Sequence, residues 1–419
     1  MEEKKNKKVL IVSPCKLPIP SVLGGAVETL LDNIINENEK NKKLDLTVIS
    51  IYNRESERIS KKIKYTEFKF IKVNRILKKI DKVINLFLKK ILRRDMEGNI
   101  LEKIKINSKI KKELLNNKYD AIILENCGFF THIYKGKVKK EYRGKFYYHI
   151  HNEIPSRINH EFIENEKIIA ISKFIIKNAE LKLNSKKKLN SIILKNGIDI
   201  DKFHKNLSID QRQNLRNRLG FNENDIVICF VGRIVKEKGI LELLEAIEKI
   251  KGTNIKLMIV GSVEFGNKKT SEFEKKIKNK SEKLNNRVKM TGFIKNEDIW
   301  KYYKISDIAI LPSIWEEPAG LTMIETIATE TILITTRVGG IPEYIKDNMA
   351  LLINNDKHIV ENIKKAIECV INNFEIYKKK TNNACELIIK EYSTVKFYEN
   401  FCNIINNGGK YEQRKNIFE

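Results

Sequence analysis

LPSIWEEPAGLTMIETIATE, residues 311–330, is the most informative stretch of this 419-residue sequence. An apolar strand ends at its start, and a loop then leads into a helix whose first turn we expect to contain Pro318. Proline is tolerated there because the first amides of a helix lack intrahelical acceptors. Ala319 and Gly320 are small, so a ligand can approach the free amides at the start of the helix. A helix N-terminus of this kind is suited to binding a phosphate group.

Two glutamates, Glu317 and Glu325, flank this expected phosphate site and are separated by seven residues. Eight helical steps would span about 12 Å, which places one carboxylate on each side of a bound diphosphate. Carboxylates suit sugar ligands because they accept hydrogen bonds from hydroxyl groups. The spacing alone also allows a simpler interpretation, in which Glu316, Glu317 and Glu325 only interact with the helix dipole or lie solvated on the surface.

Short apolar runs alternate with helical patterns on both sides of a polar segment, Asn206–Asn224. Buried runs separated by helices are typical of parallel sheets covered on both faces. We therefore expect an α/β protein with two halves joined by a polar linker, and ligand binding at the carboxyl ends of the strands, in a cleft. The expected strands are Val9–Val12, Leu46–Ile51, Ala121–Leu124, Phe146–Ile150, Ile168–Ile171, Ile192–Leu194, Ile226–Val231, Lys256–Val260, Val288–Thr291, Ile308–Leu311 and Ile332–Thr335.

Several motifs, in order along nearly the whole chain, resemble those of the retaining family-4 glycosyltransferases. Residues 311–330 are similar to the E-x7-E signature of that family. The other matching segments are Gly24-Gly25 with Glu28, His149–Asn152, Ile171–Lys173, Lys195–Phe203, Phe230–Gly239 and Val338–Glu343. The resemblance implies the GT-B architecture, in which two Rossmann-like domains face each other across a cleft. We expect an acceptor-side domain over residues 1–200, a nucleotide-sugar domain over 201–390, and a C-terminal helix and tail over 391–419 that return to the first domain.

The resemblance also implies roles for individual residues. Arg233 and Lys238 would bind the donor diphosphate, Glu325 the ribose, and Glu317 the hydroxyls of the donor sugar. The whole implied donor site comprises Gly24, Gly25, Arg233, Lys238, Glu317, Ala319, Gly320, Leu321 and Glu325. The implied catalytic set comprises His151, Arg233, Lys238 and Glu317, with His151 near the anomeric carbon.

The chemistry of the reaction agrees with these roles, because a departing nucleoside diphosphate builds up negative charge that cations and a helix N-terminus stabilise. His149 and His151 point to the same face of their strand, and His151 lies at the carboxyl end, where ligands bind. No Asp, Glu or Cys at ligand spacing accompanies the pair on that strand, so we expect no metal. Asp199-Ile200-Asp201 spells the D-x-D motif of another fold, and we interpret it as a turn without metal.

Three positions depart from the family pattern. Ala319 stands where phenylalanine is common, Glu330 replaces an expected glycine, and Ile332 replaces an expected proline. These changes leave the donor specificity open, and the end of the helix is expected to shift near Glu330.

Lys72–Arg94 has the pattern of an amphipathic helix with nine basic residues and one acidic residue, Asp81. Such a helix can lie on an anionic membrane, or its apolar stripe can pack on the sheet; the sequence leaves both open. The chain has a net charge of +26, and Lys61–Lys112, with 18 basic and 5 acidic residues, contributes +13 of it. The excess of charge therefore indicates one basic face on the first domain rather than a uniform compositional bias.

We expect a retaining, metal-independent hexosyltransferase that needs no cofactor and uses a nucleotide-sugar donor, with a UDP-sugar favoured over a GDP-sugar. The expected acceptor is a hydroxyl of a cell-surface or lipid-linked glycan. A nucleotide-sugar epimerase of the same architecture is the alternative enzyme. A nucleic-acid-binding protein is disfavoured, because Lys72–Arg94 contains a single aromatic residue, Phe87. The six scattered cysteines and the absence of a long apolar run predict a cytoplasmic protein, with peripheral attachment to the inner face of the cell membrane left open.

Overall fold

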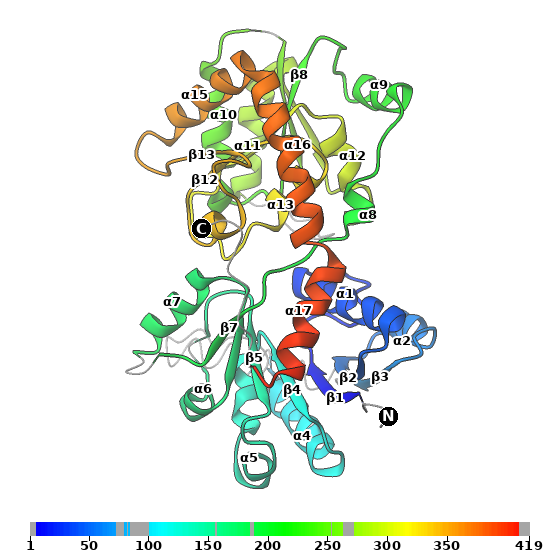
Figure 1. Ribbon diagram of the computed structural model, residues 1–419. Helices are drawn as coiled ribbons and strands as arrows, with labels where there is room; N and C mark the ends of the chain where they lie inside the picture. Colours follow the sequence, from blue (N-terminus) through cyan, green and yellow to red (C-terminus); the bar gives the residue numbers. More distant parts are fainter. Residues whose placement is uncertain are drawn as a thin grey trace. The chain divides into compact units, whose positions relative to one another are not determined.

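Two parallel β-sheets organise two separate units of the chain in the computed structural model (Figure 1). The structure describes residues 6–409 except 73–78, 82, 84–99, 156, 185–187, 253 and 263–271. The first unit comprises Met1–Lys195 and Phe397–Glu419, and the second comprises Asn196–Lys396. The boundaries expected from the sequence lie after residues 200 and 390.

The first unit contains a seven-stranded sheet with the order β3-β2-β1-β4-β5-β6-β7. Its strands pair in parallel, and the central ones are almost completely buried, because helices cover both faces of such a sheet. The strands are β1 (Lys7–Val12), β2 (Leu44–Ile51), β3 (Thr66–Ile71), β4 (Ala121–Glu125), β5 (Phe146–Ile150), β6 (Lys167–Ala170) and β7 (Ser191–Ile193). The helices are α1 (Ala26–Asn41), α2 (Arg54–Ser60), α4 (Ile100–Asn116), η1 (Gly128–Ile133), α5 (Gly136–Tyr142), α6 (His160–Asn165) and α7 (Lys173–Lys182).

The last helix, α17 (Thr394–Asn406), packs on the first unit beside α1 (Figure 1). Phe397, Phe401 and Ile405 share a buried cluster with apolar residues of α1 and β1. The Tyr398 hydroxyl donates a hydrogen bond to Asn38 Oδ1 of α1 at 2.5 Å. The expected return of the C-terminal helix to the first domain is therefore confirmed.

The second unit contains a six-stranded sheet with the order β10-β9-β8-β11-β12-β13, which is the strand order of the classical Rossmann fold. One face is covered by α12, α13 and α16, and the other by α10, α11 and α15. The strands are β8 (Ile226–Val231), β9 (Ile255–Val260), β10 (Val288–Gly292), β11 (Ile308–Leu311), β12 (Ile332–Thr336) and β13 (Leu351–Ile353). The helices are α8 (Ile200–Phe203), α9 (Ile209–Arg218), η2 (Lys236–Lys238), α10 (Ile240–Lys249), α11 (Glu272–Lys283), η3 (Asn285–Arg287), η4 (Asn296–Asp298), α12 (Ile299–Lys304), α13 (Leu321–Ala328), α14 (Ile341–Tyr344), α15 (Ile359–Asn372) and α16 (Phe374–Glu391).

The expected polar linker over 206–224 is wrong, because this segment belongs to the second unit and contains α9. Ser208 and Gln211 form a capping box at the start of α9. Arg216 is 2% exposed and lies 3.6 Å from Asp307. Polar contacts therefore help to hold this helix to its unit, together with Leu215, which packs against the apolar core.

The backbone at Glu330 has a conformation that glycine favours, although the residue there is a glutamate. α13 ends at Ala328, and Glu330 has a φ of 58°, in the left-handed region where glycine is favoured. The helix end therefore keeps the conformation that suits glycine although the side chain is a glutamate.

The described part of the chain holds no helix with the length and apolar character needed to span a bilayer. Most of the predicted basic helix, Lys72–Arg94, lies outside the described residues. Asp81, its acidic residue, is buried and accepts hydrogen bonds from the amides of Leu101 and Glu102 at 2.9 and 3.1 Å. Asp81 therefore caps the N-terminus of α4.

Candidate active site

The first set of predicted residues gathers in the second unit at the carboxyl ends of two neighbouring strands, β8 and β11. The strand order reverses direction at this pair, and ligands of open α/β sheets bind at such a switch point. Arg233 follows β8 by two residues, and Lys238 ends the short helix η2. Residues 312–320 form the loop after β11 and lead into α13.

Glu317 is the buried polar centre of this set, with 7% of its surface exposed. The Lys238 ammonium group pairs with the Glu317 carboxylate, and the Ser313 hydroxyl donates to the same carboxylate oxygen. Arg233, in contrast, is exposed, and its side chain pairs with no carboxylate in the described residues. Of these two cations, Lys238 is already paired with a carboxylate, and Arg233 is free to bind an anion.

The loop Val338–Glu343 supports Glu317 from behind through backbone contacts. The Gly340 amide donates to the Glu317 carbonyl at 2.7 Å. A Cβ atom on Gly339 would lie 2.2 Å from that carbonyl oxygen, so only glycine fits. Gly339 and Gly340 therefore support the backbone at Glu317.

The N-terminus of α13 lies in the same loop, but it begins at Leu321 and not in the turn that contains Pro318. The expectation that Pro318 lies in the first helical turn is therefore wrong, as is the 12 Å span estimated along one helix. Gly320 is the N-cap, and the amides of Leu321 and Thr322 donate to no carbonyl in the described part of the chain. These two amides remain available to an anion.

Glu325 lies on α13, is partly buried, and accepts no hydrogen bond from any described side chain. Burial raises the pKa of Glu325 to about 7, and the positive charge of Lys202 only partly opposes this. A carboxylate without a partner in such a place can accept hydrogen bonds from the hydroxyl groups of a ligand.

Glu325→Gln is expected to stabilise the protein at alkaline pH. The folded-state pKa of Glu325 lies above its ordinary value of 4.5, so the native state binds more protons and stability falls as the pH rises through about 7. Glutamine avoids this loss, which we put at about 1–2 kcal/mol after allowing for solvent contact. The melting temperature of the variant should exceed that of the wild type at pH 8, and the difference should shrink steadily towards pH 5. A difference that does not depend on pH would contradict this prediction.

The second set of predicted residues lies in the first unit, at the carboxyl ends of β1, β4 and β5. Gly24 and Gly25, with φ values of 78° and 107°, form the turn before α1. Glu28, in the first turn of α1, is 5% exposed, and burial raises its pKa. A Cβ atom on Gly25 would lie 2.2 Å from the Glu28 carboxylate, so the absence of a side chain at this position leaves room for that group.

His151 follows β5 directly and is 6% exposed, whereas His149 lies within β5 and is 1% exposed. The two rings lie with their centroids 4.0 Å apart. Both rings contact the carboxylate of Glu125, the last residue of β4, which sequence reasoning missed. Glu125 pairs with His149 in the register of the parallel sheet, so it joins the histidines from the neighbouring strand.

Glu125, His149 and His151 offer one ligand atom each within 4.8 Å of one another, a set that could hold a metal ion. Two histidines and a glutamate are a donor set that zinc accepts. His204, Glu330 and Cys385 form a second such group in the other unit, where Lys304 pairs with the Glu330 carboxylate and Lys378 donates to the Glu330 backbone carbonyl. Asp199, by contrast, caps α8 by accepting a hydrogen bond from the Lys202 amide at 3.1 Å, which agrees with a structural turn.

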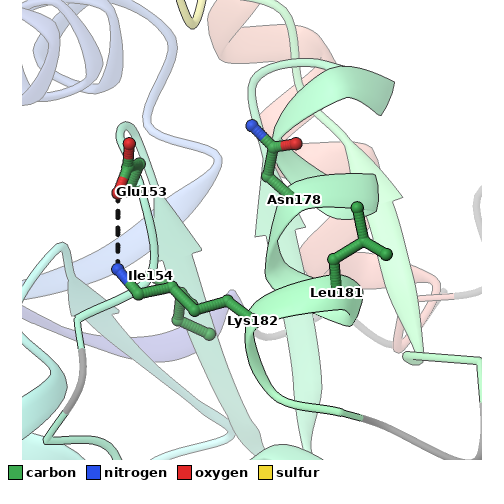
Figure 2. A pocket seen from close by; sticks show the side chains of 5 residues that line it. All are labelled: Glu153, Ile154, Asn178, Leu181 and Lys182. Atoms are coloured by element: carbon green, nitrogen blue, oxygen red, sulfur yellow. Dashed lines mark hydrogen bonds and ion pairs between the residues drawn. The ribbon is translucent and has the colours of Figure 1, made fainter.

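Figure 2 shows a pocket of about 390 Å³ in the first unit, between α7 and the loop after β5. Glu153 and Lys182 pair across it at 3.3 Å. The pocket is lined by Glu153, Ile154, Asn178, Leu181 and Lys182, and by none of the predicted site residues.

Residues 211–386 match the family described as glycosyl transferases group 1. An uncharacterized glycosyltransferase of Methanocaldococcus jannaschii is 29% identical over 48% of this chain and 50% of its own length. The lipopolysaccharide 1,2-N-acetylglucosaminetransferase of Salmonella typhimurium is 26% identical over 57% of this chain and 60% of its own length. The chain therefore spans between half and two thirds of the length of these two relatives.

Solved glycosyltransferase structures share the fold over almost the whole chain. A glycosyltransferase from Rickettsia africae superimposes with a TM-score of 0.75 at 19% identity, covering 97% of this chain and all of the other. Anabaena HepE in complex with UDP-glucose superimposes with a TM-score of 0.69 at 16% identity, covering 96% and 100%. The similarity confirms the α/β architecture of two Rossmann-like domains.

Proposed function

We propose that this chain is a retaining glycosyltransferase that acts on a nucleotide-sugar donor, since its residues 211–386 match the family described as glycosyl transferases group 1. One observation carries the proposal. A free cation, a paired cation and the free N-terminus of α13 meet two carboxylates at the switch point of a Rossmann-like sheet. This arrangement suits a ligand that has a diphosphate at its centre and hydroxyl-rich groups at both ends.

In this proposal Arg233 and Lys238 bind the diphosphate together with the backbone of Ala319, Gly320 and Leu321. These groups are fixed before the reaction and face the negative charge that develops as the nucleoside diphosphate departs. They would supply this counter-charge without a metal ion or cofactor.

The two carboxylates bind the two ends of the donor. Glu325 is without a partner among the described residues, which supports hydrogen bonding to the ribose hydroxyls. Glu317 is held by Lys238 and Ser313, which supports a fixed acceptor for hydroxyls of the transferred sugar. The turn at Gly24 and Gly25 is proposed to contact the donor through its backbone, and His151 to contact the transferred sugar near its anomeric carbon.

We further propose a UDP-sugar as donor and a glycan or lipid-linked glycan as acceptor. The complexes of HepE with UDP and UDP-glucose support the choice of nucleotide. The lipopolysaccharide transferase among the relatives supports a cell-surface glycan as acceptor.

A panel of UDP- and GDP-sugars, tested by thermal shift and then by product analysis with a glycan acceptor, tests the proposal. We expect UDP-sugars to raise the melting temperature, and the anomeric configuration of the donor to be kept in the product. Glu325→Ala should weaken nucleotide binding. If no nucleotide sugar changes the melting temperature, the proposal fails. If an altered nucleotide sugar forms without any acceptor, the chain is an epimerase instead.

Peripheral attachment to an anionic membrane through the segment 72–94 is the third part of the proposal. Two of its apolar residues that the structure describes, Ile80 and Val83, are 43% and 67% exposed rather than packed on the sheet. Exposed apolar residues with lysines and arginines near them in the sequence can insert at the surface of anionic lipids. This location would bring the enzyme to a lipid-linked acceptor on the inner face of the cell membrane.

Sedimentation with liposomes tests this attachment. The wild type should bind vesicles that contain anionic lipid at low salt and should be released by high salt. The double variant Ile80→Asp/Val83→Asp should bind vesicles at least about ten-fold more weakly, because two apolar side chains that would be buried in the lipid are lost. Ile209→Asp, at an apolar residue of the second unit that is 88% exposed, is the matched control and should bind like the wild type. Equal binding by both variants would contradict the proposal.

A further inference from the structure

We infer that Glu125 is a positioning residue, which holds the His151 imidazole with its hydrogen on Nε2 and leaves Nδ1 as a buried acceptor for a hydroxyl of the bound sugar. The tautomer follows from the contacts of the described residues alone. The identity of the hydroxyl rests on the proposed function.

The contacts of Glu125 define which nitrogen of each ring faces the carboxylate. Glu125 is completely buried, and its carboxylate faces both histidines. His149 Nδ1 lies 3.1 Å from both Oε1 and Oε2, and His151 Nε2 lies 2.8 Å from Oε2. The carboxylate therefore contacts one nitrogen of each ring.

The neighbouring backbone fixes the direction from which His151 meets the carboxylate. The Asn126 amide donates to the His149 carbonyl at 2.9 Å, and the His151 amide donates to Asn126 Oδ1 at 3.3 Å. Asn126 itself has a φ of 44°, which turns the chain sharply after β4. The ends of β4 and β5 are thus joined by two hydrogen bonds of Asn126.

The position of the ring hydrogen follows from these contacts. His151 Nε2 faces a carboxylate oxygen at 2.8 Å, and His151 Nδ1 is buried without a hydrogen-bond partner in the described residues. A second ring hydrogen on Nδ1 would be buried without an acceptor, so the ring carries one hydrogen. An ionised carboxylate can only accept hydrogen bonds, so the single ring hydrogen of His151 must lie on Nε2.

The consequence is a bare nitrogen, Nδ1 of His151, whose lone pair can only accept. This atom is buried and has no hydrogen-bond partner among the residues that the structure describes. A buried polar atom without a partner is unfavourable, and a hydroxyl donor relieves this on binding. The site therefore favours a ligand that brings a hydroxyl group to this position, as a sugar does.

Nitrogen-15 NMR of histidine side chains in the full-length protein tests the tautomer without any substrate. The six histidines are resolved by comparison with His151→Asn. The wild type should show hydrogen on Nε2 and a bare Nδ1 for His151 throughout pH 6–8. Hydrogen on Nδ1 in the wild type would overturn the inference. Stoichiometric zinc in the purified protein would also overturn it, because a metal ion at Nε2 would replace the hydrogen.

Glu125→Gln tests the role of the carboxylate. Glutamine replaces one accepting oxygen with an NH₂ donor, so a ring nitrogen that faces the NH₂ group must accept rather than donate, and His151 should become a mixture of tautomers. Transfer should slow by at least ten-fold in kcat, with a smaller change in KM for the donor. Glu166→Gln is the matched control, since Glu166 is another fully buried carboxylate of the same unit and accepts from the amides of Gly144 and Phe146. It should leave the His151 signals and kcat unchanged.

The two arms separate this inference from the proposed function. If the wild-type tautomer is as expected and disappears in Glu125→Gln, but no nucleotide sugar is a substrate, the positioning role stands and the proposed function fails. If transfer occurs and Glu125→Gln keeps both the wild-type tautomer and kcat, the inference fails and the proposed function stands. Should Glu125→Gln fail to fold, the wild-type spectrum still decides the tautomer.

Discussion

Arg233→Ala is expected to lower kcat by about 10²- to 10³-fold and to leave the melting temperature close to that of the wild type. The guanidinium is exposed and pairs with no carboxylate in the described residues, so its loss leaves no buried charge unpaired. Its proposed partner is the departing diphosphate, and removing one preorganised group that faces developing charge costs about 3–4 kcal/mol in the transition state. Steady-state kinetics with a UDP-sugar donor and thermal unfolding provide the two measurements.

Arg218→Ala is the matched control for this prediction. Arg218 is another exposed arginine of the second unit, at the end of α9, and has no part in the proposed site. It should keep the wild-type kcat. If both variants lose the same small factor, the diphosphate does not bind at Arg233 and the site assignment is wrong.

Lys238→Ala should behave differently from Arg233→Ala because Lys238 also has a structural partner. Its ammonium group neutralises the Glu317 carboxylate, which is 7% exposed. Removing the cation leaves a buried carboxylate with the Ser313 hydroxyl as its remaining side-chain donor among the described residues. We therefore expect a loss of stability as well as of kcat, and Glu317→Gln added to Lys238→Ala should restore the stability but not the rate.

The sheets could be predicted closely because their strands are buried on both faces and read as continuous apolar runs. β5, β8 and β11 begin and end at the expected residues. β3 was missed because TEFKFI alternates charged and apolar residues at the edge of the sheet. β13 was missed because it has only three residues.

The site could be predicted in part, because motif order and the rule of carboxyl ends place residues without knowledge of side-chain contacts. Arg233 and His151 could be placed in this way. Glu125 could not, since its contact with His149 depends on the pairing of β4 with β5, 24 residues apart. The sequence did contain a signal for Glu125. This glutamate ends the apolar run AIILE, at the carboxyl end of a buried strand, where ligands bind. The pairing of Lys238 with Glu317, 79 residues apart, is likewise a property of the tertiary structure.

Gly239→Ala is expected to destabilise the second unit by about 3 kcal/mol or more and to abolish nucleotide binding. Gly239 joins η2 to α10 with a φ of 69°, which costs any other residue about 1–2 kcal/mol. A Cβ atom would in addition lie 1.9 Å from the carbonyl oxygen of Pro312, in the loop after β11. Backbone cannot yield as a flexible side chain does, so the two loops must separate, at a further cost of about 1–3 kcal/mol.

Gly220→Ala separates the two contributions to this loss. Gly220 has a similar φ of 81° in the same unit, but a Cβ atom there would meet no atom within 4 Å. In Gly220→Ala the free energy of unfolding should therefore fall only by the backbone cost of about 1–2 kcal/mol, and the affinity for the nucleotide should not change. Urea unfolding and nucleotide titration measure both effects. Lys238 precedes Gly239 and Ser313 follows Pro312, so separating these loops also separates the two groups that hold Glu317. Equal losses of stability and of nucleotide affinity in the two variants would mean that this loop contact does not support the site.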